Sequence, residues 1–149
     1  MTKFLLKISI LLFSIQLTAQ TTNGIISGMG KWVPIKTDFY NNNKLTDTEE
    51  VTFSEKCVPY IDFQGGGIIA TKEFDSDCKE KKSEPGTYKY IANGLYRITQ
   101  NGESYDVKPK PNGNEMQLII TSKDENGEEL KVVVFFKRYD SFKNKKAKK

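Results

Sequence analysis

The side chains that most often carry out catalysis are scarce in this chain. It contains no histidine, which removes the usual general base, the Ser–His and Cys–His nucleophile pairs and the commonest zinc ligand. Carboxylates remain, but neither Asp75-Ser76-Asp77 nor the run 124–129 has the glycine spacing of an EF-hand loop. The glycine run 65–67 is not followed by Lys-Ser/Thr, so we interpret it as a hairpin turn rather than a phosphate loop. We therefore expect no catalysis, no metal and no cofactor.

Residues 1–20 have the three parts of a secretory signal peptide. Lys3 and Lys7 supply the positive charge, residues 8–17 are mostly apolar, and Ala19 lies just before a plausible cleavage point. The apolar run is shorter than the ~20 residues that a transmembrane helix needs, and no cysteine follows it for lipid attachment. We expect this segment to be cleaved, the protein to be secreted or periplasmic, and no transmembrane segment to remain.

The chain has two cysteines, Cys57 and Cys78. In an oxidising compartment, two cysteines indicate one disulfide, and two free thiols are the alternative. The bridge would close a loop of about 20 residues and stabilise the fold by roughly 3 kcal/mol in the chain-entropy model.

The net charge of +4 arises from the two ends of the chain. The leader contributes two lysines, and the segment from Lys137 onward is rich in lysine, so acidic side chains outnumber basic ones in the body. Such a body lacks the basic face of a nucleic-acid binder. We expect residues 140–149 to form a basic, disordered tail or at most a short helix. This tail is a candidate contact for an anionic surface.

Four Asn-Gly pairs divide the second half of the chain into strand-like runs. Asn-Gly is the strongest short signal for a two-residue hairpin turn, because both central residues of a type I′ turn need positive φ. The runs between the pairs are rich in β-branched and aromatic residues, which favour strands. The pairs lie at 93–94, 101–102, 112–113 and 126–127, and the predicted strands are 86–92, 95–100, 103–108, 115–123 and 128–138.

Three further strands are predicted upstream, at 32–39, 60–64 and 67–74, with a turn at Gly65-Gly66 between the last two. The polar stretch 40–55 is expected to be a loop with at most a helical turn. Eight antiparallel strands are the number at which an up-and-down barrel closes around side chains or one small ligand. The prediction is therefore an all-β, eight-stranded antiparallel barrel over residues 28–139. A two-sheet sandwich is the alternative, which the near-consecutive hairpins disfavour.

Two-residue turns would also fix the strand register. They place Ile91 opposite Tyr96, Tyr96 opposite Val107, Val107 opposite Leu118, and Leu118 opposite Phe135, which makes one continuous apolar row. A slip of one residue would move every side chain to the other face. The agreement of turn chemistry with this apolar pattern favours the barrel.

A second apolar row follows two residues along, and the upstream hairpin adds Phe63 opposite Ile68 and Ile61 opposite Ala70. On the other face, Arg97 is expected to pair with Asp106. The predicted inward-facing, ligand-lining residues are Ile61, Phe63, Ile91, Tyr96, Ile98, Tyr105, Val107, Leu118, Ile120, Val133 and Phe135. A hollow barrel would offer them as a mostly apolar pocket with tyrosine hydroxyls as polar handles. The alternative is that they fill a solid core.

The start of the first strand resembles a known family. Gly30-Lys31-Trp32 matches the Gly-x-Trp motif of the lipocalins. The resemblance implies that Trp32 closes the barrel floor and that a basic residue near the end of the last strand packs over it. Arg138 is in the expected place, with Lys137 as the alternative. Such a stack is a cation–π contact worth ~0.5–2 kcal/mol.

The chain is similar, more specifically, to bacterial secreted lipocalin-like domains. These have a leader, Gly-x-Trp, one cysteine before a strand, a second cysteine after the next strand, and then a Gly-Tyr-type strand. Here the later features are Cys57, Cys78 and Gly86-Thr87-Tyr88, and the resemblance covers residues 28–139. It implies a non-catalytic exported protein that binds a small hydrophobic ligand or lipid in the barrel interior. The alternative is a solid-core envelope accessory or interaction module that acts through its outer surface, with residues 132–136 as the contact.

Overall fold

The computed structural model describes residues 30–143. The predicted signal peptide, the first two residues of the predicted domain and the chain beyond Lys143 lie outside the described residues. The strands are β1 (Gly30–Asn41), β2 (Lys44–Glu50), β3 (Tyr60–Gln64), β4 (Ile68–Phe74), β5 (Glu80–Lys81), β6 (Gly86–Ala92), β7 (Leu95–Gln100), β8 (Glu103–Asn112), β9 (Glu115–Lys123) and β10 (Glu129–Arg138), followed by the helix α2 (Asp140–Lys143). Within this range no helix is long and apolar enough to span a bilayer.

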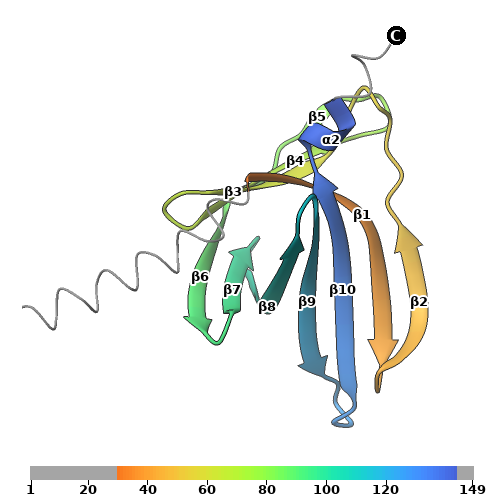
Figure 1. Cartoon of the computed structure of the whole chain (residues 1–149), viewed down its shortest axis with the longest axis vertical. Helices are drawn as coiled ribbons and strands as arrows, with labels where there is room; N and C mark the ends of the chain where they lie inside the picture. Colours follow the sequence, from red (N-terminus) through yellow and green to blue (C-terminus); the bar gives the residue numbers. More distant parts are fainter. Residues whose placement is uncertain (1–29, 144–149) are drawn as a thin grey trace, which may run out of the picture.

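Eight of these strands form a closed antiparallel barrel (Figure 1). Their order around the barrel is β1–β10–β9–β8–β7–β6–β4–β3, and β3 pairs back to β1. β2 and β5 lie outside this ring, where β2 pairs with β1 and β5 pairs with β4. The predicted all-β, eight-stranded up-and-down barrel is confirmed, and the last five strands form the predicted meander.

The stretch predicted to be a loop between the first two strands contains a strand instead. β2 pairs with the second half of β1 through a tight turn at Asn42-Asn43, whose φ angles are 47° and 63°. These are the positive values that a type I′ turn needs, and asparagine tolerates them. All seven residues of β2 are exposed, so the apolar alternation that reveals the other strands is missing here.

The register prediction holds best between β7 and β8. Tyr96 lies opposite Val107 and Ile98 opposite Tyr105. On the other face, the Arg97 guanidinium donates two hydrogen bonds to the Asp106 carboxylate, at 2.7 and 2.9 Å. The Asn101-Gly102 turn has positive φ at both residues, as predicted for type I′.

Two neighbouring hairpins depart from the predicted register, and only the first of them changes which side chains face inward. Between β6 and β7 the register shifts between Tyr90 and Ala92, so Tyr90 takes the place opposite Tyr96 that was predicted for Ile91. Between β8 and β9 the turn residues are Gly113 and Asn114, so Val107 lies opposite Ile120 rather than Leu118. A shift of two residues keeps a side chain on the same face.

The β9–β10 hairpin places every residue of β10 on the face opposite to the one that a two-residue turn predicts. The Asp124 carboxylate accepts hydrogen bonds from the backbone N–H groups of Asn126 and Glu128, at 2.9 and 2.8 Å. Gly127 has a φ of 81°. This Asx-stabilised loop is longer than a two-residue Asn-Gly turn, and Leu118 therefore lies opposite Val134 rather than Phe135.

The glycine run at 65–67 likewise changes which residues of β4 face inward. The β3–β4 loop uses all three residues Gly65–Gly67, so Phe63 lies opposite Ile69 and Ile61 opposite Thr71. Ile68, predicted to face Phe63, is 43% exposed. Gly67 must remain glycine because its φ is 77° and an added Cβ would lie 2.7 Å from the Tyr88 carbonyl oxygen.

Cys57 and Cys78 form the predicted disulfide, with their Cα atoms 5.5 Å apart. It joins the connection between β2 and β3 to the segment that follows β4, on the outside of the barrel. At the other end of the chain, residues 140–143 adopt the alternative of a short helix. The Phe142 ring packs edge-to-face on Phe53, with ring centres 5.7 Å apart.

Candidate functional site

The inner face of the barrel is the site that the sequence predicts. Eight of the eleven predicted residues share the face that carries Trp32 and the core: Ile61, Phe63, Tyr96, Ile98, Tyr105, Val107, Leu118 and Ile120. Their inward position follows from the strand registers. Contact with a ligand stays a prediction.

Three predicted residues do not face inward. Ile91 lies in the irregular part of β6 and is 42% exposed. Val133 and Phe135 lie on the outer face, because the longer β9–β10 loop places Val134 opposite the inward Leu118. The inward residues of β10 are Val132, Val134 and Phe136 instead.

Several inward residues were missed by the sequence reasoning. Tyr88 and Tyr90 face inward because the β6–β7 register shifts between Tyr90 and Ala92, whereas the predicted pairing of Ile91 with Tyr96 would turn both tyrosines outward. The strict alternation of Met116, Leu118 and Ile120 on β9 is a signal that could have found Met116. The missed inward residues are Ile69, Tyr88, Tyr90, Met116, Val132, Val134 and Phe136.

One end of the interior is closed by Trp32, whose side chain is fully buried. The Arg138 guanidinium lies over the indole, with its Cζ 4.1 Å from the ring centre. This is the cation–π stack that the resemblance implied. Gly30 has a φ of 65°, and an added Cβ would lie 3.5 Å from the Arg138 guanidinium. The Trp32 Nε1 has no hydrogen-bond partner within residues 30–143.

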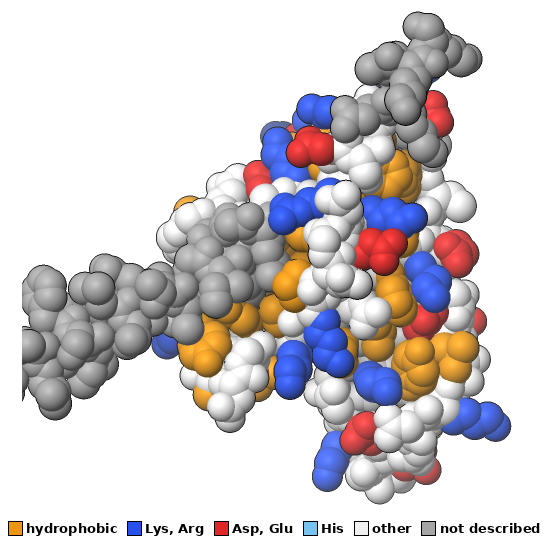
Figure 2. Space-filling model, viewed as in Figure 1, with side chains coloured by type: hydrophobic (Ala, Val, Ile, Leu, Met, Phe, Trp, Pro, Cys, Tyr) orange, Lys and Arg blue, Asp and Glu red, His pale blue; other side chains and the backbone are white. Residues whose placement is uncertain are grey.

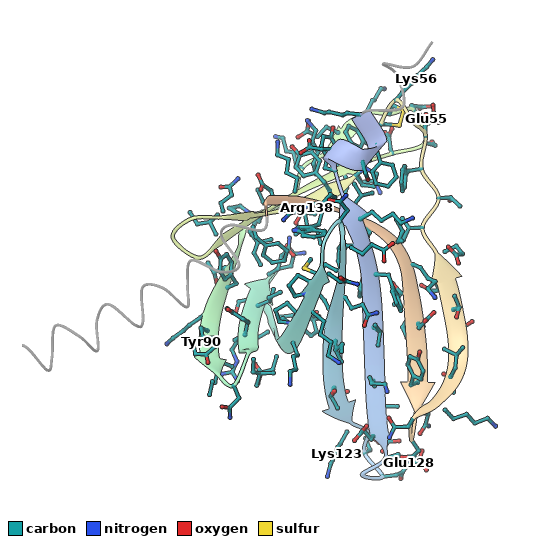
Figure 3. The ribbon with its side chains drawn as sticks, viewed as in Figure 1. Glu55, Lys56, Tyr90, Lys123, Glu128 and Arg138 are labelled. Atoms are coloured by element: carbon teal, nitrogen blue, oxygen red, sulfur yellow. A yellow bond between two sulfur atoms is a disulfide. The ribbon has the colours of Figure 1, made fainter. Side chains whose placement is uncertain are left out.

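The interior becomes progressively more exposed away from Trp32. Along the inner face of β9, Met116 and Leu118 are buried at 1% and 6% exposure, Ile120 is half-buried and Ser122 is exposed. Figure 3 shows this direction, with Arg138 at one end of the barrel and Lys123 and Glu128 at the other. We define the mouth face as the inward side chains that are half-buried or exposed toward this second end: Ile98, Tyr105, Ile120 and Val132.

Tyrosines supply most of the polar atoms of the inner face. The Tyr88 hydroxyl donates to the Gln64 carbonyl oxygen at 2.7 Å, and the Tyr90 and Tyr96 rings pack edge-to-face with centres 5.2 Å apart. Burial raises the pKa of the Tyr96 phenol, and Tyr90 and Tyr88 raise it further. The hydrogen bond to Glu103 raises the pKa of Tyr105. Both phenols are therefore neutral at physiological pH, and the Tyr105 hydroxyl, which donates to Glu103, can still accept a hydrogen bond through its oxygen.

Three hollows in the described range are lined mainly by residues outside the inner face, although Met116 and Phe136 border the second one. One of about 350 Å³ lies between the β2–β3 connection and the end of β4. A second of about 130 Å³ lies near Ile35 and Phe135, and a third is an open depression beside β5. At the Trp32 end the inward side chains are in mutual contact and form one buried cluster. Any ligand in the barrel would therefore contact the mouth face first.

The described residues 30–143 contain no group of three or more His, Cys, Asp or Glu side chains that could hold a metal ion. No family model matches the chain, and no curated protein matches it. The barrel is consistent with the lipocalin-like fold that the sequence resembles. Function must be inferred from the geometry.

Proposed function

We propose that this chain is an exported, non-catalytic barrel protein that binds a small apolar molecule or lipid at the mouth face. One observation carries the proposal: the inner face is sealed at Trp32 and leaves apolar side chains half-buried or exposed at the other end. Tyr105 alone is 41% exposed. Covering such surface is favourable by roughly 25 cal/mol per Å² of apolar area removed from water. The Tyr105 hydroxyl is a polar handle for orienting the ligand.

Two features support a binding role rather than catalysis. The chain has no histidine, and the mouth face presents aliphatic carbons and phenols instead of an acid–base pair. Two features support export. The leader has the organisation of a signal peptide, and the Cys57–Cys78 disulfide is typical of an oxidising compartment.

A matched pair of variants on β9 tests the site. Ile120 is on the inner face and Ile119 is on the outer face, and both are half-buried. We expect Ile120→Glu to weaken binding of the neutral apolar dye N-phenyl-1-naphthylamine at least tenfold, because a carboxylate would be desolvated by the dye. Ile119→Glu should leave dye affinity unchanged. Quenching of Trp32, the chain's single tryptophan, gives a second readout, and circular dichroism checks the fold of each variant.

Failure of the wild-type protein to bind the dye, or equal losses in both variants, would contradict the proposal. Native mass spectrometry of the protein purified from an exporting host adds an independent measurement. A reproducible bound mass that disappears on delipidation supports the carrier role.

The outer wall offers a second candidate function, as an interaction module. Val133 is 7% exposed although it faces outward, and Phe135 and Ile119 beside it are half-buried. The Lys36 ammonium lies 4.3 Å from the centre of the Phe135 ring. Figure 2 shows apolar side chains on this side of the molecule with lysine side chains among them. If this wall is the contact, Ile119→Glu should abolish association with a partner and Ile120→Glu should not.

A further inference from the structure

A second pocket lies outside the barrel, beside the disulfide. We call it the disulfide pocket. Its walls are the β2–β3 connection, residues 51–59, and the end of β4 with the residues after it, 73–76. Its volume of about 350 Å³ lies within the range of small-molecule sites, ~300–1,000 Å³. It shares no lining residue with the mouth face.

Both walls of this pocket are held in place. The Cys57–Cys78 disulfide ties the first wall to the segment just beyond the second. The Val51 N–H donates to the Ile35 carbonyl oxygen at 3.0 Å, which anchors the connection to β1. In the second wall, the Asp75 carboxylate accepts hydrogen bonds from the Asp77 and Lys79 backbone N–H groups, each at 2.9 Å. A preformed pocket loses less ordering entropy when a ligand binds.

The lining combines apolar surface with acidic charge. Val51, Phe53 and Phe74 are half-buried, and the two charged lining residues, Glu73 and Asp75, are both acidic. The basic residue of the connection, Lys56, is not in the lining, and Figure 3 shows it with Glu55 at the outer tip of the molecule.

The contacts of the neighbouring Lys72 show how groups of this wall can bind an ammonium. The Lys72 ammonium lies 5.6 Å from the centre of the Phe74 ring and 2.7 Å from the Glu80 carboxylate. An ammonium is thus held between an aromatic ring and a carboxylate, as cation–π and ion-pair attraction favour. The pocket side of the wall presents the same two kinds of group, in Phe53, Phe74 and Glu73.

We propose that the disulfide pocket is a second binding site, for a small amine whose apolar body packs on the aromatic rings and whose ammonium is bound near Glu73 and Asp75. The site does not depend on ligand binding in the barrel. It does depend on oxidation, because reduction of the Cys57–Cys78 bond unties the two walls. The pocket is therefore assembled in an oxidising compartment and lost in a reducing one.

Backbone NMR of the full chain, titrated with benzylammonium and with benzoate as matched probes, tests this site. Benzylammonium should shift the amide signals of residues 51–59 and 73–76, and benzoate should not. Glu73→Gln should weaken benzylammonium binding roughly tenfold, which corresponds to ~1.4 kcal/mol. Glu49→Gln, on the exposed strand β2, is the matched control and should bind as the wild type does.

Two further measurements separate this site from the barrel. Ile120→Glu should leave benzylammonium binding unchanged, so failure of the barrel proposal would not affect this one. Reduction of the disulfide, or the double variant Cys57→Ala with Cys78→Ala, should abolish the shifts. If either reduced form unfolds, the Glu73→Gln comparison decides. Equal shifts by benzoate, wild-type affinity in Glu73→Gln, or no shifts in these two segments would overturn the proposal.

Discussion

The two ends of the barrel interior carry the same alternating apolar pattern but bury it to different degrees. At one end Trp32, Met116 and Phe136 are at most 2% exposed. At the other end Ile120 is half-buried and Tyr105 is 41% exposed on the same inner face. The pattern therefore serves as core at one end and as a binding surface at the other, and stability and function should respond to different residues.

The strand pairing explains why the ends differ. The barrel closes through three residue pairs between β1 and β3 and two between β4 and β6. Both contacts lie in the first residues of β1 and β6, and the rest of β6 has no pairing to β4. The second half of β1 pairs with β2 instead of β3. Because the pairing of β1 with β3 ends at Trp32, β3 does not close the barrel beside the rest of β1, and the inner face is more accessible away from Trp32.

Replacement of Trp32 by alanine should have the largest effect on stability. Removing a fully buried tryptophan should cost about 3–5 kcal/mol, from lost burial and the cavity left behind. Chemical denaturation followed by far-ultraviolet circular dichroism measures this value. Tyr105→Ala at the mouth is the control and should cost less than ~1 kcal/mol. A Trp32→Ala loss below that of Tyr105→Ala would show that the sealed end does not dominate stability.

Leu118 and Ile120 allow the buried part of the interior and the mouth face to be compared within one strand, β9. Leu118→Ala should cost about 2–5 kcal/mol, the range for a buried aliphatic side chain. Ile120→Ala should cost at least ~1 kcal/mol less, because part of its side chain is already in water. Urea denaturation of both variants measures the difference. Equal losses would mean that the mouth face is packed as tightly as the rest of the interior.

Substitution of Arg138 tests how much the cation above Trp32 contributes to the stability of the sealed end. Arg138→Ala should cost about 0.5–2 kcal/mol, the range of a cation–π contact. Arg138→Lys keeps the charge but not the planar group, and should recover only part of the loss. The fluorescence of Trp32 should change in both variants. An Arg138→Ala variant as stable as the wild type would show that the stack on Trp32 does not contribute to stability.

The existence of the strands was predictable because β-branched and aromatic runs fill the spaces between turn residues. Register was predictable only where the turn has the assumed length, as at Asn101-Gly102 between β7 and β8. At Asn126-Gly127 the Asp124 side chain organises a longer loop and reverses the face of β10. One loop residue is enough to exchange Val133 and Phe135 for Val132 and Val134.

Other features had no signal in the sequence pattern. β2 is held by backbone pairing to β1 and by its Asn42-Asn43 turn, without apolar alternation. The disulfide pocket depends on how the segment 51–59 crosses the end of β4, which strand patterns do not specify. The difference between the two ends also depends on where strands stop pairing, and periodicity does not reveal this.

Protonation of Asp38 should weaken the pairing of β1 with β2 at low pH, and this effect should be the smallest of the four predicted here. It lies on the outer face of β1, and its carboxylate accepts hydrogen bonds from the Thr48 hydroxyl at 2.9 Å and the Lys36 ammonium at 3.1 Å. Burial alone would raise the pKa of Asp38, but these hydrogen bonds outweigh it and hold the pKa below 3.8. The stabilisation is therefore present above the unfolded-state pKa and is lost as pH falls through the folded-state value.

Because Thr48 is on β2, acid should loosen the β1–β2 pairing before it affects the Trp32 end. Hydrogen exchange of the β2 amides, compared with Trp32 fluorescence as the pH is lowered below 3.8, measures the two regions separately. Asp38→Asn should leave β2 poorly protected already at neutral pH and remove the acid-dependent change, whereas Asp47→Asn, on the exposed strand itself, should keep it. An acid-dependent loss that persists in Asp38→Asn would assign the effect to another carboxylate. Loss of both signals at one pH would show that the two ends unfold as a single unit.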